Sequence, residues 1–122
     1  MPKKILVVDD DASVTSLIKT RLEANLYSVM TAKNGEEGLK ILKEEKPDLI
    51  ICDIMMPKLD GYTFVLEVKK LEDFRKTPII ILTVKAGMQD IFKVEGVNEY
   101  VVKPFEDEVL LERVKKCLTH YI

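Results

Sequence analysis

The 122-residue sequence contains no tryptophan, one histidine and two cysteines. The cysteines, Cys52 and Cys117, have no CxxC or Cys/His spacing, so we expect free thiols in a reducing compartment and predict neither a zinc site nor a redox pair. The histidine, His120, lies next to the C-terminus, where a solvated side chain is the usual outcome. A Ser/His/Asp catalytic arrangement is therefore not predicted.

Glycine is also scarce, and its five positions are dispersed rather than gathered in a phosphate-binding loop. No apolar run is long enough to cross a bilayer, and residues 1–4 lead into a strand-like run without the apolar segment of a signal peptide. The 19 basic residues are interspersed with 21 acidic ones, and the net charge is −2. We therefore expect a cytoplasmic protein with no membrane partner and no direct nucleic-acid contact.

The apolar content is sufficient for one compact core. Apolar residues make up 47% of the chain, and no linker, low-complexity stretch or internal repeat divides it. A chain of this length forms one domain more readily than two. The sequence thus predicts a single domain over residues 1–122.

Five short apolar runs are expected to be strands, and several are nearly continuous aliphatic stretches, as is typical of strands covered on both faces. The runs are residues 5–8, 28–31, 49–52, 79–82 and 100–102. Apolar stripes with helical spacing lie between and after them. These stripes are Val14, Leu17, Ile18 and Leu22; Leu39, Ile41 and Leu42; Phe64, Val65, Val68 and Leu71; and Leu110, Val114, Cys117, Leu118 and Tyr121.

Local signals mark several helix ends. Asn34 is a predicted N-cap, and Pro47 and Pro78 are each expected to follow a helix that they cannot continue. Strand and helix therefore alternate along the chain, which predicts an α/β fold with a parallel sheet and helices on both faces. Ligands of such folds bind beyond the carboxyl ends of the strands.

Polar side chains follow the ends of four predicted strands: Asp9 and Asp10, Asp53, Thr83, and Lys103. If the strands are parallel, these residues converge at one edge of the sheet. Carboxylate oxygens are hard ligands that suit Mg²⁺, and three clustered carboxylates repel one another without a cation. An ammonium or a hydroxyl at the same edge can contact phosphoryl oxygens.

A simpler interpretation of the first acidic cluster is helix capping. Asp10 or Asp11 can serve as N-cap of a helix that begins near Ala12. Position favours Asp11 for this role, which leaves Asp9 and Asp10 for a cation. Taken singly, Thr83 also suits a strand and Lys103 a solvated surface.

Together these motifs resemble the receiver domain of two-component response regulators, over essentially the whole chain. The motifs are Val7-Val8-Asp9-Asp10, Asp53-Ile54-Met55-Met56-Pro57 followed by Asp60-Gly61, Ile81-Leu82-Thr83, and Tyr100-Val101-Val102-Lys103-Pro104-Phe105. The resemblance implies a flavodoxin-like, doubly wound five-stranded parallel sheet in the order 2-1-3-4-5. It also implies a cis peptide between Lys103 and Pro104.

The resemblance further implies roles for individual residues. Asp53 corresponds to the phosphoacceptor; Asp9, Asp10, Asp53 and the backbone carbonyl of Met55 to the Mg²⁺ ligands; Thr83 and Lys103 to the phosphoryl contacts; and Thr83 and Tyr100 to the conformational switch. The implied partners are a sensor histidine kinase or phosphotransfer protein, a downstream protein and, after phosphorylation, a second copy of the chain. We expect the signal to leave by protein contact.

The sequence departs from the family pattern at two places. Val84 stands where a very small residue is usual, and the segment between Thr83 and Tyr100 is short, so only a stunted helix is expected over residues 89–95. Three rival functions fit the sequence less well. A haloacid-dehalogenase-type phosphatase needs a second Asp where Met55 stands. A receiver-like binding module that is not phosphorylated does not need every chemical position filled. A flavin-binding domain needs phosphate-binding loops that the sequence lacks.

Overall fold

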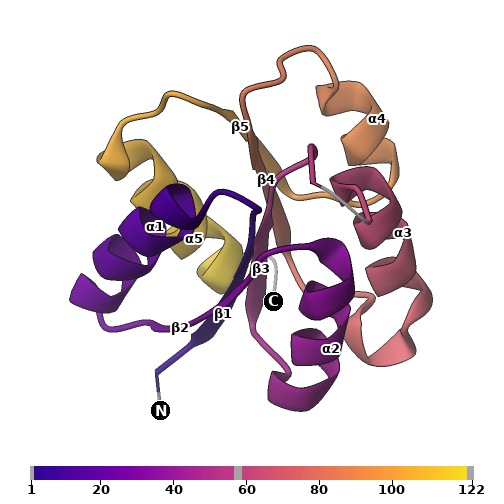
Figure 1. Cartoon of the computed structure of the whole chain (residues 1–122), viewed down its shortest axis with the longest axis horizontal. Coiled ribbons are helices and arrows are strands. Elements are labelled where there is room, and N and C mark those ends of the chain that lie inside the picture. The colour runs from indigo at the N-terminus through magenta and orange to yellow at the C-terminus, as the bar shows by residue number, and fades with distance from the viewer. Residues whose placement is uncertain (1, 57–58, 121–122) are drawn as a thin grey trace.

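The structure, a computed structural model, describes residues 2–56 and 59–120. Strands and helices alternate along this chain, and one 3-10 helix, η1, follows α3 (Figure 1). The elements are β1 (Lys4–Val8), α1 (Ala12–Ala24), β2 (Ser28–Ala32), α2 (Gly35–Glu45), β3 (Leu49–Cys52), α3 (Gly61–Lys70), η1 (Glu72–Phe74), β4 (Ile79–Thr83), α4 (Gln89–Val94), β5 (Glu99–Val102) and α5 (Asp107–His120).

The five strands form one parallel sheet in the order β2-β1-β3-β4-β5, which confirms the predicted fold. The strand Leu49–Cys52 matches its predicted range, and each of the others is one residue longer than predicted. The extra residues include Lys4, Thr83 and Glu99, whose backbones pair in the sheet although their side chains are polar. Backbone pairing therefore continues beyond the apolar runs that mark the strands in the sequence.

Two layers of helices cover the sheet. Figure 1 shows α1 and α5 on one face and α2, α3 and α4 on the other. Alternate residues of β1 enter two separate cores: Ile5 and Val7 pack with α1 and α5, whereas Leu6 and Val8 pack on the opposite side. No helix in the described ranges has the length and apolar character needed to span a membrane.

The predicted helix ends agree with the structure. Asp11 caps α1 by accepting hydrogen bonds from the Ser13 and Val14 amides at 2.9 and 3.3 Å. Asn34 caps α2 through the Glu37 amide at 2.8 Å. The two prolines follow α2 and η1, respectively.

One predicted core residue is wrong. Leu17 of α1 is 52% exposed, whereas Ile18 and Leu22 are buried. Ile18 and Leu22 are four residues apart and share one face of α1, whereas Leu17 lies about 100° around the helix from Ile18, beyond the face that the sheet covers. Tyr121, the last member of the C-terminal stripe, lies outside the described residues. Cys52 and Cys117 are buried free thiols, as predicted.

Candidate functional site

Three carboxylates meet at the carboxyl edge of the sheet. Strands β1 and β3 pair in register, with Val8 opposite Cys52, and the Asp53 amide donates to the Val8 carbonyl at 3.0 Å. The residues that follow the two strands are consequently neighbours. Asp9, Asp10 and Asp53 each offer a carboxylate oxygen, and these oxygens all lie within 4.8 Å of one another.

Backbone amides orient two of these acids. Asp9 is 4% exposed, and its Oδ1 accepts from the Asp11 amide at 3.0 Å. The Oδ1 of Asp53 accepts from the Ile54 amide at 2.7 Å. In both residues the second oxygen, Oδ2, faces the Lys103 ammonium. Asp10 is exposed at the rim.

Lys103 enters the same cluster from the end of β5. Its Nζ lies 2.8 Å from Asp9 Oδ2 and 3.9 Å from Asp53 Oδ2, and its side chain is largely buried. The Lys103–Pro104 peptide bond that follows is cis, as the resemblance implied. The resemblance implied that Lys103 contacts a phosphoryl group, and in this structure its direct partner is Asp9.

The donor set fits a hard divalent cation. One ammonium offsets only part of the charge of three carboxylates, and Mg²⁺ prefers oxygen ligands of this kind. Met55 follows Asp53 by two residues, and its side chain is 60% exposed. The assignment of its backbone carbonyl to the metal stays a prediction, and Pro57 of the same motif lies outside the described residues.

The two expected switch residues are linked through the backbone of Lys85. Thr83 is fully buried at the end of β4, and its Oγ1 accepts from the Lys85 amide at 3.3 Å. The hydroxyl of Tyr100 donates to the carbonyl of the same residue. The Tyr100 ring also packs against Phe92 of α4, with centroids 5.9 Å apart. A displacement of the connection between β4 and α4 would thus affect both hydroxyls.

Gly61 supports the site in a way that sequence reasoning did not identify. A Cβ at this position would lie 2.3 Å from the Asp53 carbonyl oxygen and 2.7 Å from Ile54 Cα. The first residue of α3 must therefore be a glycine for the helix to approach the backbone of Asp53 this closely. The Asp60-Gly61 pair belonged to the family motif, but the sequence alone did not show which backbone the glycine meets.

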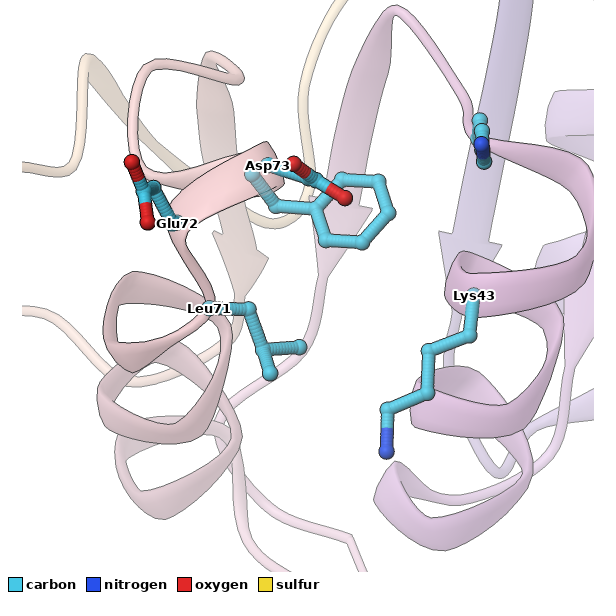
Figure 2. A pocket seen from close by; sticks show the side chains of 6 residues that line it. Lys43, Leu71, Glu72 and Asp73 are labelled. Atoms are coloured by element: carbon cyan, nitrogen blue, oxygen red, sulfur yellow. The ribbon is translucent and has the colours of Figure 1, made fainter.

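A separate hollow of about 420 Å³ lies between the C-terminal end of α2 and the end of α3 with η1 (Figure 2). Lys43 projects from α2 on one side of it, and Leu71, Glu72 and Asp73 lie on the α3 and η1 side. None of these residues belongs to the loops that carry Asp9 and Asp53. The hollow is therefore not part of the acidic site.

The sequence matches the response regulator receiver domain family over residues 5–115. The chain belongs to this family. Among solved structures, chemotaxis protein CheY4 of Vibrio cholerae aligns with a TM-score of 0.89 at 32% identity, over 95% of this chain and 98% of that one. TrrA of Thermotoga maritima, solved in complex with Mg(2+)-BeF, aligns with a TM-score of 0.85 at 38% identity, over 93% and 97% of the two chains.

Curated relatives of this receiver domain are longer proteins. "Probable transcriptional regulator ycf27" of Porphyra purpurea is 47% identical over 118 residues, which cover 95% of this chain and 47% of the relative. The "Alkaline phosphatase synthesis transcriptional regulatory protein PhoP" of Bacillus subtilis is 42% identical over 120 residues, or 97% and 49% of the two chains. The chain thus spans about half of their length, and the expectation of no direct nucleic-acid contact applies to these 122 residues alone.

Both departures from the receiver pattern are visible in the structure. Helix α4 has six residues, Gln89–Val94, one fewer than the short helix predicted. Val84 is 67% exposed beside the buried Thr83. Its methyl groups therefore lie at the protein surface rather than in an apolar layer.

Proposed function

We propose that residues 1–122 form a receiver domain in which Asp53 accepts a phosphoryl group from a sensor histidine kinase or phosphotransfer protein in the cytoplasm. The observation that supports this most directly is the gathering of three carboxylates within 4.8 Å of one another, with the Lys103 ammonium 3.9 Å from Asp53. Phosphoryl transfer depends on such positioning and charge neutralisation.

In this proposal Asp9, Asp10, Asp53 and the Met55 carbonyl hold Mg²⁺. The bound ion would neutralise charge on the transferring group. The Ile54 amide keeps Asp53 Oδ1 in place, which leaves Oδ2 to attack phosphorus. The new bond joins this oxygen to phosphorus, and the bond from phosphorus to the donor histidine nitrogen breaks with its electron pair on nitrogen.

Lys103 and Thr83 then bind the transferred group. Lys103 exchanges its contact with Asp9 for a phosphoryl oxygen, and the Thr83 hydroxyl, at present an acceptor for the Lys85 amide, becomes a donor to another. Movement of the Thr83 side chain toward the phosphoryl group draws its oxygen away from the Lys85 amide, so the Lys85 backbone can shift and release Tyr100. The resulting surface of α4, β5 and α5 recruits a downstream protein or a second copy of the chain.

The test is intact mass measurement after treatment with acetyl phosphate. One phosphate adduct is expected with Mg²⁺ and none in EDTA. Asp53→Asn should lose the adduct, whereas Asp90→Asn, which alters an exposed acid of α4, should retain it. An adduct that persists in Asp53→Asn, or that forms equally in EDTA, contradicts the assignment.

A further inference from the structure

A basic hollow of about 510 Å³ lies near the amino ends of β4 and β5, at the edge of the sheet opposite to the acidic site. It is bounded by the end of α3, the connection from η1 to β4, and the turn between α4 and β5. Its polar lining is Lys69, Arg75, Lys76, Glu95 and Asn98, with Gly96 beside them.

Lys69 is held in place without an acidic partner. Its Nζ donates to the carbonyls of Arg75 and Thr77 at 3.0 and 3.3 Å. Among the described residues it forms no ion pair, and desolvation lowers its pKa. A partly buried ammonium of this kind is stabilised by an incoming anion, because the carbonyls supply only partial negative charge.

Two further cations face the same space. Arg75 uses its Nε on the Lys69 carbonyl at 3.5 Å, and neither Arg75 nor Lys76 forms an ion pair within the part of the chain that is described. Three cations thus converge in a chain whose net charge is −2. Like charges gathered at one place attract counter-ions from solution.

The other polar groups leave room for an anion. The Oδ1 of Asn98 accepts from the Ile79 amide at 2.9 Å, so its NH₂ group is the donor that remains. Glu95 is the one acid in the lining, and its Oε2 accepts from the Tyr62 hydroxyl at 3.2 Å. The hollow therefore offers an excess of donors over acceptors.

We propose that this hollow is a binding site for a small diphosphate-bearing anion. The planar Arg75 guanidinium suits two phosphate oxygens, and the ammonium groups of Lys69 and Lys76 suit others as point charges. The volume lies in the range of small-molecule sites. This site shares no residue with the acidic cluster, so it does not rest on the phosphorylation of Asp53.

Occupancy of the hollow would restrain α4. The ligand would bridge the connection before β4 and the turn that follows α4, where Gly96 and Asn98 lie. Tyr62 of α3 already joins that end of α4 through Glu95, and its ring packs edge-on against Phe92 at 5.6 Å. A diphosphate would therefore add a second attachment between the α4–β5 turn and the body of the domain.

The test is titration of the full chain with inorganic pyrophosphate, ADP and orthophosphate, followed by amide NMR in EDTA so that no divalent ion bridges the anion to the acidic site. We expect saturable shifts of the Gly96 and Asn98 amides with the two diphosphates and weaker binding of orthophosphate. The tighter of the two diphosphates identifies an inorganic or a nucleoside source.

Charge-neutral variants make the test specific. Arg75→Gln and Lys76→Gln should each weaken binding about three- to tenfold, and Glu95→Gln, which keeps an acceptor for Tyr62, should tighten it about twofold or more. Lys70→Gln is the matched control, because Lys70 pairs with Glu67 and does not line the hollow. The proposal would be overturned if Lys70→Gln and Arg75→Gln changed the affinity for diphosphate equally. Amide shifts confined to Thr83 and Lys103, or a titration that does not saturate, would also overturn it.

Discussion

Lys103 Nζ lies 1.1 Å closer to the Oδ2 of Asp9 than to that of Asp53, with distances of 2.8 and 3.9 Å. The ammonium therefore offsets the most buried acid of the cluster, which is 4% exposed. Because an uncompensated buried carboxylate is costly, this pair stabilises the metal-free site.

Removal of that ammonium should destabilise the metal-free protein. We expect Lys103→Met to lower the free energy of unfolding by about 2–4 kcal/mol in EDTA, because it leaves Asp9 without its partner. Mg²⁺ should recover more stability in this variant than in the wild type. Urea unfolding with and without Mg²⁺ measures both effects, with Lys115→Met of the exposed α5 surface as control. Equal losses in the two variants would show that the Asp9 pair contributes nothing.

Mg²⁺ should raise the melting temperature of the wild-type chain. A ligand that binds the native state at 100 times its dissociation constant adds about 2.7 kcal/mol. Asp10→Ala should lose most of this gain, whereas Asp11→Asn should retain it, because Asp11 caps α1 and asparagine is an equally good cap. If Asp10→Ala responds to Mg²⁺ like the wild type, the ion binds elsewhere.

Val84 should prolong the phosphorylated state. Its exposed side chain follows Thr83 in the chain, where we expect it to crowd the water that must approach phosphorus in line. Val84→Ala should therefore speed dephosphorylation and change unfolding free energy by less than about 0.5 kcal/mol, since the site is exposed. The decay of phosphorylated protein, followed by mass or radiolabel, measures this. Unchanged or slower decay in the variant refutes shielding.

The buried thiols should make the fold sensitive to alkali. Burial, followed by the charge of Glu99, raises the pKa of Cys117 to about 12, and burial raises the pKa of Cys52 well above its usual value. In the unfolded chain a thiol ionises near pH 8.5. Between pH 8.5 and 12 the unfolded state therefore binds fewer protons than the native state, and stability falls as pH rises.

Each thiol contributes a slope of up to about 1.4 kcal/mol per pH unit in that window. Urea unfolding under reducing conditions from pH 8 to 10.5 measures the slope. Cys117→Ala is expected to be less stable at pH 8 but to show a shallower decline, and Cys52→Ala serves as the second comparison. If the free energy of unfolding falls with pH as steeply in both variants as in the wild type, groups other than the two thiols cause the decline.

The fold was predictable because several strands are nearly continuous apolar runs and the polar residues of the site follow strand ends directly. Parallel pairing then brings Asp9, Asp10, Asp53 and Lys103 to one edge, as the sequence indicated. The preference of Lys103 for Asp9 was not predictable, since it depends on about one ångström of side-chain placement. The role of Gly61 was also hidden, because the atoms it meets belong to the backbone of Asp53 and Ile54.

The basic hollow could not be predicted for a different reason. Lys69 belongs to the end of α3, Lys76 and Asn98 lie in two separate connections, and none belongs to a motif. Because acidic and basic residues are interspersed along the sequence, it does not show which basic side chains become neighbours in the folded chain. The exposure of Leu17 was not predictable for a similar reason. An apolar side chain does not show how wide a face of its helix the sheet covers.

Two main-chain hydrogen bonds continue the sheet beyond the ends of its strands. They separate the residues that fix the spacing of the acids from the surface residues that can change during evolution. The Asp9 amide donates to the Ala32 carbonyl and the Asp53 amide to the Val8 carbonyl, both at 3.0 Å. These bonds involve no side chain, so substitutions on the outer surfaces of α4 and α5 leave the spacing of the two acids unchanged. A lineage can thus change the surface that α4 and α5 present through surface residues alone while inheriting the same arrangement of acids.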